Sequence, residues 1–177
     1  GGESFPDFLR AHWNSRRKFV READLFKTIR SETPDKAKVF ALLREMEQDI
    51  DLYVALSHPE DSLWEEGQRP YVRELRMYSV RQPWPLLLAA HRAYPAHGFT
   101  EILRACSIIS LRYNVISGLI TNEQERTYNS VAQRIAAGEV SSPAQAIRAL
   151  APIYVNDSSF QQNFATKVLR TTAARNN

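Results

Sequence analysis

The stretch Glu101–Leu119, EILRACSIISLRYNVISGL, indicates how the chain folds. At about 100° per residue, its apolar side chains and the residues just before it fall on two sides of one helix. One side carries Phe99, Ile102, Leu103, Cys106, Ile109, Tyr113 and Ile116, and the other carries Ile108, Leu111, Val115 and Leu119. A helix that is apolar on most of its circumference is surrounded by other helices. We therefore expect residues 99–118 to form the buried central helix of a bundle.

The rest of the chain has the periodicity of short and medium helices, separated by proline- and glycine-containing turns such as Pro95–Gly98. Helices are expected over about 5–13, 21–30, 36–56, 70–78, 84–94, 121–137 and 143–150, with a last one from 157. In no segment do apolar and polar residues alternate with a period of two, which is the pattern of a β-strand. The sequence predicts an all-α fold, a multi-helix bundle of about nine helices in a single domain over 1–177, which we expect to be an excised middle region of a longer protein.

The helix expected after Thr33–Asp35 has the most regular pattern. Val39, Leu43, Met46, Ile50 and Tyr53 recur at spacings of 4, 3, 4 and 3. Such spacing is typical of a coiled-coil seam that packs against another helix. Further expectations are a capping box formed by Thr121 and Gln124, an inward-facing Phe26, and buried anchors at Trp13, Trp64 and Trp84.

Composition narrows the class of protein. Of 177 residues, 44% are hydrophobic and 24% charged, which is ordinary for a globular domain. No apolar run reaches the roughly 18 residues that cross a membrane, and no signal peptide is recognisable, so we expect a cytoplasmic protein with no membrane partner. The single cysteine, Cys106, excludes a disulfide framework and is expected to be a buried thiol.

Candidate catalytic and metal-binding residues are few. The four histidines have no metal-ligand spacing, and no glycine-rich phosphate loop or serine-nucleophile motif occurs. The carboxylates Glu45, Glu47, Asp49 and Asp51 are expected on a solvated helix face. We therefore predict no catalytic residue, no metal site and no cofactor in this chain, and expect that it is not itself an enzyme.

Basic residues form two clusters. Of the 23 basic residues, 18 are Arg and 5 are Lys, and the net charge is +3. The first cluster is Arg16, Arg17 and Lys18, with Arg10 and Arg21 nearby, and the second is Arg69, Arg73 and Arg76, with Arg81 beyond. Two interpretations stay open: these residues bind the phosphate backbone of a nucleic acid, or they pair with acids such as Glu74 or those of another domain.

Two stretches resemble the helical middle region of GmrSD-type restriction and phage-defence proteins. The first is Phe8–Trp13, FLRAHW, followed by Phe19–Phe26, FVREADLF; the second is Leu111–Leu119, LRYNVISGL, followed by Thr121–Asn122 and Arg126–Ala132. In that family these helices join an N-terminal ParB-like domain, which carries a DGQQR motif for nucleotide use and modified-DNA sensing, to a C-terminal HNH nuclease domain. Both active motifs are missing here.

The resemblance implies a non-catalytic helical scaffold or connector of a modification-dependent DNA restriction protein. Its partners would be the N-terminal nucleotide- and DNA-sensing domain and the C-terminal nuclease domain of the same protein. DNA itself would be a further partner through Arg16, Arg17, Lys18, Arg69, Arg73 and Arg76. The alternative is an α-helical protein–protein interaction module with no nucleic-acid role.

Overall fold

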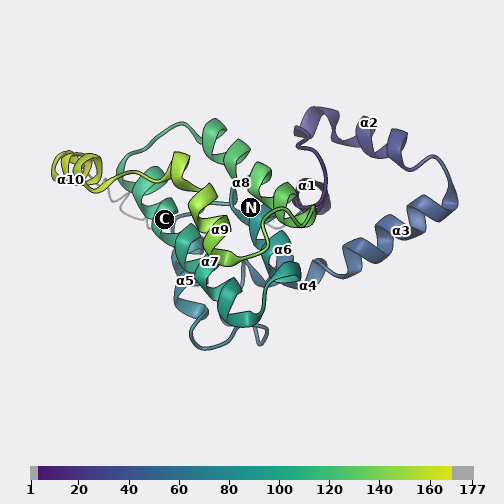
Figure 1. The fold of residues 1–177 in the computed structure, drawn as a ribbon, viewed down its shortest axis with the longest axis horizontal. Coiled ribbons are helices and arrows are strands. Elements are labelled where there is room, and N and C mark those ends of the chain that lie inside the picture. The colour runs from purple at the N-terminus through teal and green to yellow at the C-terminus, as the bar shows by residue number, and fades with distance from the viewer. Residues whose placement is uncertain (1–3, 169–177) are drawn as a thin grey trace, which may run out of the picture.

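Helices make up all the regular structure between residues 4 and 168, the part of the chain that the computed structural model describes (Figure 1). In order they are α1 Phe5–Asn14, α2 Glu22–Glu32, α3 Lys36–Glu47, α4 Ile50–Ala55, α5 Arg69–Met77, α6 Trp84–Ala93, α7 Ala96–Ser110, η1 Leu111–Ile116, α8 Thr121–Ala136, α9 Pro143–Ala149, η2 Ala151–Ile153 and α10 Asp157–Thr166. No strand occurs in this part of the chain. The predicted all-α bundle is confirmed.

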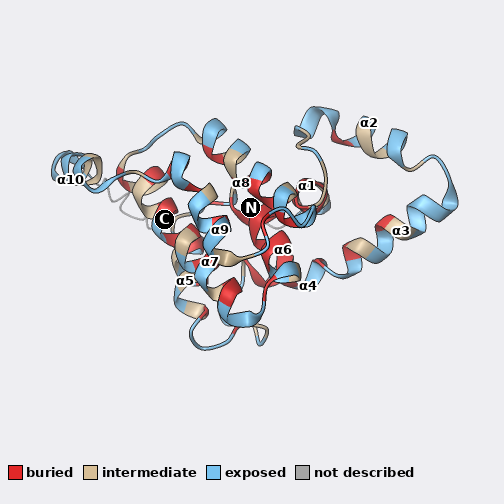
Figure 2. Ribbon diagram, in the orientation of Figure 1, coloured by how far each residue is buried: buried red, intermediate tan, exposed pale blue. Residues whose placement is uncertain are grey.

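Two helices share the centre of the bundle. The residues of α6 from Trp84 to Ala90 are all buried, and α6 packs against α1, α4, α7 and α8. Its neighbour α7 packs against α5, α6, α9 and η1. Buried positions concentrate in this region, as Figure 2 shows.

The apolar stripe predicted from Phe99 to Ile116 is buried along its whole length. The second group, on the other side of the helix, was expected to be covered as well, and this holds only in part, since Leu111 and Val115 are half-buried. Ile108 and Leu119 are 38% and 45% exposed. The helices that pack against α7, which are α5, α6 and α9, leave these two side chains partly at the surface.

The link from α7 to α8 differs from the prediction in its hydrogen bonding. After α7 the backbone widens into the π-helical η1, and Gly118 then ends the segment with φ = +59°. Gln124 does not complete a capping box, and Thr121 lies inside α8. Instead, the amides of Gln124 and Asn114 bond each other twice, at 2.8 and 2.9 Å, because a buried amide needs partners for both its donor and its acceptor.

Residues 96–98 form the first turn of α7 and not the separate turn that the sequence suggested. Gly98 lies where the start of α9 meets α7. A Cβ atom added at Gly98 would come within 2.6 Å of Cγ of Pro143, so the absence of a side chain permits this close approach. Ser142 caps α9, since its side chain accepts a hydrogen bond from the backbone N–H of Gln145.

The long helix expected over 36–56 is broken at Gln48 and Asp49 into α3 and α4. Of its predicted seam, Met46 and Tyr53 are buried, whereas Val39, Leu43 and Ile50 are exposed. The helices α2 and α3, here called the arm, project from the body of the molecule and are largely exposed (Figures 1 and 2). Phe26 on α2 is 76% exposed and does not face inward as predicted, because no helix of the body covers it.

The three tryptophan anchors are confirmed, since Trp13, Trp64 and Trp84 are all buried. The Trp64 indole N–H lies 3.0 Å from the carbonyl oxygens of Ala55 and His58, which fixes the connection after α4. The last helix was expected to carry apolar side chains as far as Leu169, which lies outside the described residues. Among the helices of 4–168, none combines the length and the apolar character needed to cross a membrane.

Candidate functional site

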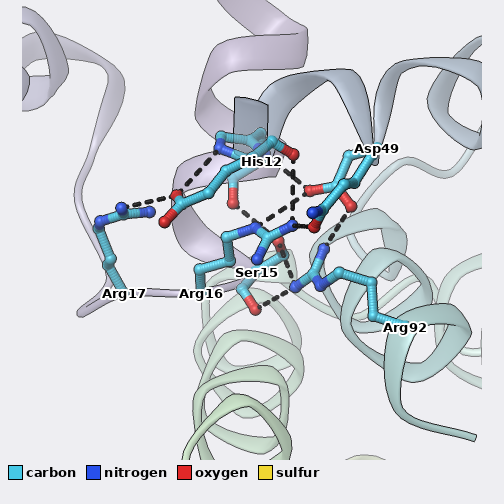
Figure 3. A network of polar contacts seen from close by, with 8 residues as sticks. His12, Ser15, Arg16, Arg17, Asp49 and Arg92 are labelled. Atoms are coloured by element: carbon cyan, nitrogen blue, oxygen red, sulfur yellow. Dashed lines mark hydrogen bonds and ion pairs between the residues drawn. The ribbon is translucent and has the colours of Figure 1, made fainter. Parts of the chain in front are cut away.

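Asp49 lies at the break between α3 and α4 and is only 1% exposed. Three side chains from distant parts of the chain donate to its carboxylate (Figure 3). His12 Nδ1 lies 2.7 Å from Oδ2, Arg16 Nε lies 3.4 Å from Oδ2, and Arg92 Nη1 lies 2.6 Å from Oδ1. The prediction that Asp49 lies on a solvated face was wrong, because the helix break turns this carboxylate into the core, where charged partners offset its desolvation.

Further hydrogen bonds extend this cluster, which we call the Asp49 network. Arg92 Nη2 donates to both the carbonyl oxygen and the hydroxyl of Ser15, each at 3.0 Å. Arg16 Nη2 donates to the carbonyl of Glu45 at 3.3 Å and to Oε1 of Gln48 at 2.9 Å. The network therefore joins the end of α1, the α3–α4 junction and α6.

Arg17 completes the outer side of the network. Its Nη2 lies 2.7 Å from Oε2 of Glu45, and its guanidinium stacks 4.6 Å from the ring centroid of Trp13. A guanidinium over an indole face gains from cation–π attraction as well as from its ion pair. Glu45 is thus engaged with the first basic cluster, whereas Glu47 and Asp51 are exposed as predicted.

The environment of His12 favours its neutral form. Burial lowers the pKa of His12 below its ordinary value of 6.5, against the opposing effect of the Asp49 hydrogen bond. In the neutral ring, the hydrogen bond to Asp49 requires the proton on Nδ1. Nε2 then carries a lone pair, lies 3.9 Å from Oε2 of Glu45, and makes no hydrogen bond to any residue of 4–168.

Asp49 remains ionised in spite of its burial. Burial acts to raise its pKa, but the hydrogen bond from His12 and the positive charge of Arg92 outweigh this, so the pKa lies below its ordinary value.

A neutral imidazole beside an ionised carboxylate is also the orienting half of a nucleophilic triad. Here the Ser15 hydroxyl donates to the backbone carbonyl of His12 at 2.7 Å, and the ring and the carboxylate are both inaccessible to solvent. This geometry holds helices together and gives no substrate access to the pair.

The predicted nucleic-acid-binding residues have different surroundings. Arg16 and Arg17 are engaged in the Asp49 network, whereas Lys18 is exposed. Arg69 and Arg73 both pair with Glu60, at 3.3 and 2.6 Å. The hydrogen bond from Arg73 lowers the pKa of Glu60 below its ordinary value.

Glu74, which the sequence offered as a pairing partner, instead accepts a hydrogen bond from Ser107. Arg76 is exposed and has no ion pair within 4–168, and Arg81 lies 3.7 Å from Asp7. In the same range, no ion pair or hydrogen bond joins the Arg16–Lys18 cluster to the Arg69–Arg76 cluster.

A groove of about 460 Å³ brings other cations together beside Lys18. Its lining includes Lys18, Phe19, Arg21 and, from α8, Arg126, with Asp24 and Glu32 on the α2 side. Phe19, Arg21 and Arg126 also line an adjoining hollow of about 310 Å³, whose Glu125 is paired with Arg10 at 3.6 Å. We call these two hollows the Lys18 groove. Sequence reasoning did not connect Arg126 with Lys18, because they are over 100 residues apart and no local pattern links them.

Two further expectations concern reactive groups. Cys106 is fully buried, and burial raises the pKa of its thiol, which makes it an inert core residue. Within residues 4–168, no three His, Cys, Asp or Glu side chains are grouped so that they could hold a metal ion. Comparison with protein-family models, with curated proteins and with solved structures finds no match to this chain.

Proposed function

We propose that this chain is a non-catalytic helical scaffold that holds neighbouring domains or partners in a fixed relation. The observation that carries this proposal is the Asp49 network. One buried carboxylate receives hydrogen bonds from His12, Arg16 and Arg92, which come from widely separated segments. Removing one member of a buried ionic cluster costs about 3–5 kcal/mol, so the segments that it joins resist displacement.

The specific setting that we propose is a modification-dependent DNA restriction protein. Support for this setting comes from the two stretches that resemble the helical region of GmrSD-type proteins, FLRAHW…FVREADLF and LRYNVISGL. In that setting the scaffold connects a nucleotide- and DNA-sensing domain to a nuclease domain. Rigidity suits this role, because a connector that bends freely would not transmit a rearrangement from one domain to the other.

DNA contact by the scaffold itself is best supported at the Lys18 groove. Lys18, Arg21 and Arg126 are exposed and make no ion pair with another residue of 4–168, so their charges are available to phosphates. Phe19 lies among them and offers an apolar surface to sugars or bases. By contrast, Arg16 and Arg17 would have to leave buried or stacked partners before they could bind a phosphate.

The experiment is DNA binding by the 177-residue chain between about 50 and 200 mM salt, where phosphate contacts make affinity fall steeply. Two variants carry the same loss of charge: Lys18→Ala/Arg21→Ala/Arg126→Ala at the groove, and Arg69→Ala/Arg73→Ala/Arg76→Ala on α5. Three lost phosphate contacts, at about 0.9 each, reduce the slope of log affinity against log salt by about 2.7.

We expect this reduction in the groove variant and little change in the α5 variant. Reduction in the α5 variant alone would move the DNA contact to the second cluster. No binding by the unmodified chain at low salt would contradict DNA contact by the scaffold, and its role would then lie in joining its neighbours alone.

The second candidate function is an α-helical protein–protein interaction module with no nucleic-acid role. The exposed apolar side chains of the arm favour it, since Phe26, Phe40 and Leu43 are turned to solvent there. An apolar interface is nearly insensitive to salt, so the same salt series separates the two functions.

A further inference from the structure

A hollow of about 720 Å³ is lined by the turn after α4, the end of α5 and the start of α6. Its apolar lining consists of side chains that belong to the core, namely Leu56, Leu75, Val80 and Trp84. Polar side chains line it as well, among them Ser57, Arg76 and Ser79. An apolar surface with a few polar groups, in a volume between about 300 and 1,000 Å³, is typical of a site for a small molecule.

Three polar side chains of this lining have no partner within residues 4–168. The guanidinium of Arg76 and the hydroxyls of Ser57 and Ser79 make no hydrogen bond or ion pair with another residue of that range. They come from α5 itself, from the turn after α4 and from the turn after α5. Their donors are therefore available to a ligand in the hollow.

The backbone of Ser79 has a conformation that glycine adopts more easily. Its φ is +56°, and among residues 4–168 it is the one residue other than glycine with a positive φ. Its N–H donates to the carbonyl of Arg76 at 3.0 Å, and the N–H of Val80 donates to that of Leu75 at 3.4 Å. This is the Schellman ending of a helix, in which glycine is the usual residue at the position of Ser79. The sequence thus places a hydroxyl beside the hollow at the cost of backbone strain, and such strain is concentrated at functional sites.

We propose that this hollow binds a small phosphate monoester whose organic part is apolar. A phosphate monoester presents three strong acceptor oxygens, and the hollow offers three donor groups without a partner. The planar guanidinium of Arg76 fits two phosphate oxygens at once, and the hydroxyls of Ser57 and Ser79 donate to the phosphate from the neighbouring turns. The apolar part of the ligand lies against the core side chains of the lining.

The charge around the hollow favours an anion of this kind. Arg81 also lines it, and its guanidinium lies 5.1 Å from the ring centroid of Trp84. Asp7, an acidic residue of the lining, has Oδ2 3.7 Å from Nη1 of Arg81, so these two charges offset each other and Arg76 leaves the lining positive. A carboxylate has one oxygen fewer than a phosphate, and a neutral ligand would leave Arg76 without a counter-charge. This inference does not depend on DNA contact or on the restriction setting.

Calorimetric titration of the 177-residue chain with phenyl phosphate tests the site, at concentrations up to about 10 mM so that millimolar affinity is covered. We expect saturable binding. Inorganic phosphate lacks the apolar part and benzoate lacks the phosphate, so each is expected to bind about tenfold more weakly or worse.

Two substitutions separate a ligand site from a purely structural role. Arg76→Ala is expected to weaken the binding of phenyl phosphate by about tenfold or more, because it removes a charged donor. Ser79→Gly is expected to raise the temperature of unfolding, because glycine relieves the positive φ, and yet to weaken binding, because the hydroxyl is lost. A variant that is more stable and binds less has not lost the ligand through unfolding.

The matched control is Arg104→Ala, which removes an exposed arginine of α7 outside the hollow and should bind phenyl phosphate as the unmodified chain does. The groove variant Lys18→Ala/Arg21→Ala/Arg126→Ala should also bind it normally, which separates this result from the DNA test. Absence of saturable binding by phenyl phosphate would overturn the proposal. So would binding that Arg76→Ala or Ser79→Gly leaves unchanged, or that inorganic phosphate or benzoate equals.

Discussion

At the scale of single residues, Asp49 has the greatest consequence. Its carboxylate is buried and satisfied by His12, Arg16 and Arg92 together. Removing such a group costs more free energy than the intact cluster contributes to stability, because its cations are then left buried without a counter-charge. The strength of the network is therefore best measured by deleting its centre.

Asp49→Ala is expected to lower the free energy of unfolding by about 3–5 kcal/mol, since Arg92 would remain in the core without its carboxylate. Urea denaturation followed by circular dichroism measures this change. The control is Glu66→Ala on the exposed loop after α4, with an expected change within about 0.5 kcal/mol. Equal effects of the two substitutions would show that the network contributes little.

The pH dependence of stability follows from His12. Because its pKa in the folded chain lies below the ordinary 6.5, the unfolded chain binds more protons as the pH falls through that value. The free energy of unfolding should therefore decrease from about pH 7.5 to about pH 5.5. Burial also lowers the pKa of His91, whose ring packs edge-on against Phe99, and this acts in the same direction. Asp49 has a lowered pKa, so it loses its contribution only below about pH 3.8, outside this window.

The His12→Asn variant tests the origin of this dependence. Its amide N–H can replace Nδ1 as the donor to Asp49 but does not titrate, so stability should change less between the two pH values. His97→Asn, at an exposed position, is the matched control and should keep the dependence of the unmodified chain. Identical pH dependence in all three proteins would assign the effect to other groups.

At the scale of elements, the contact between α7 and α9 depends on a single missing side chain. Gly98→Ala is expected to destabilise the fold by about 1–3 kcal/mol, because the new Cβ would overlap Cγ of Pro143. Gly67→Ala is the control, since a Cβ there meets no atom within 4 Å. Thermal unfolding of the two variants gives the comparison, and an unperturbed Gly98→Ala would mean that α9 can shift without cost.

At the scale of the whole molecule, a buried centre of α6 and α7 carries a projecting arm of α2 and α3 (Figure 1). Local stability follows packing, so the two parts should open independently. Amide hydrogen exchange is expected to be slowest in α6 and much faster in the arm. Arm amides as protected as those of α6 would indicate that the arm and the body unfold together.

Sequence periodicity was enough to predict the helices and most of the buried side chains. The stripe from Phe99 to Ile116 and the anchors Trp13, Trp64 and Trp84 are buried as expected. These predictions succeed because helical spacing and caps are local properties, set by neighbours within a few residues. The same reasoning could not tell which residues of the predicted seam would be covered, because Val39, Leu43 and Met46 share one helical spacing and only Met46 is buried.

The sequence by itself therefore determined that the chain forms helices and which side of most helices turns inward. Tertiary structure alone decided the environment of the charges. His12, Arg16 and Arg92 reach Asp49 across 37, 33 and 43 residues of chain. The pKa of a carboxyl group and its exposure depend on what surrounds it in space. The break at Gln48 and Asp49 turns the Asp49 carboxylate into the core, and no local pattern of the sequence indicates that break.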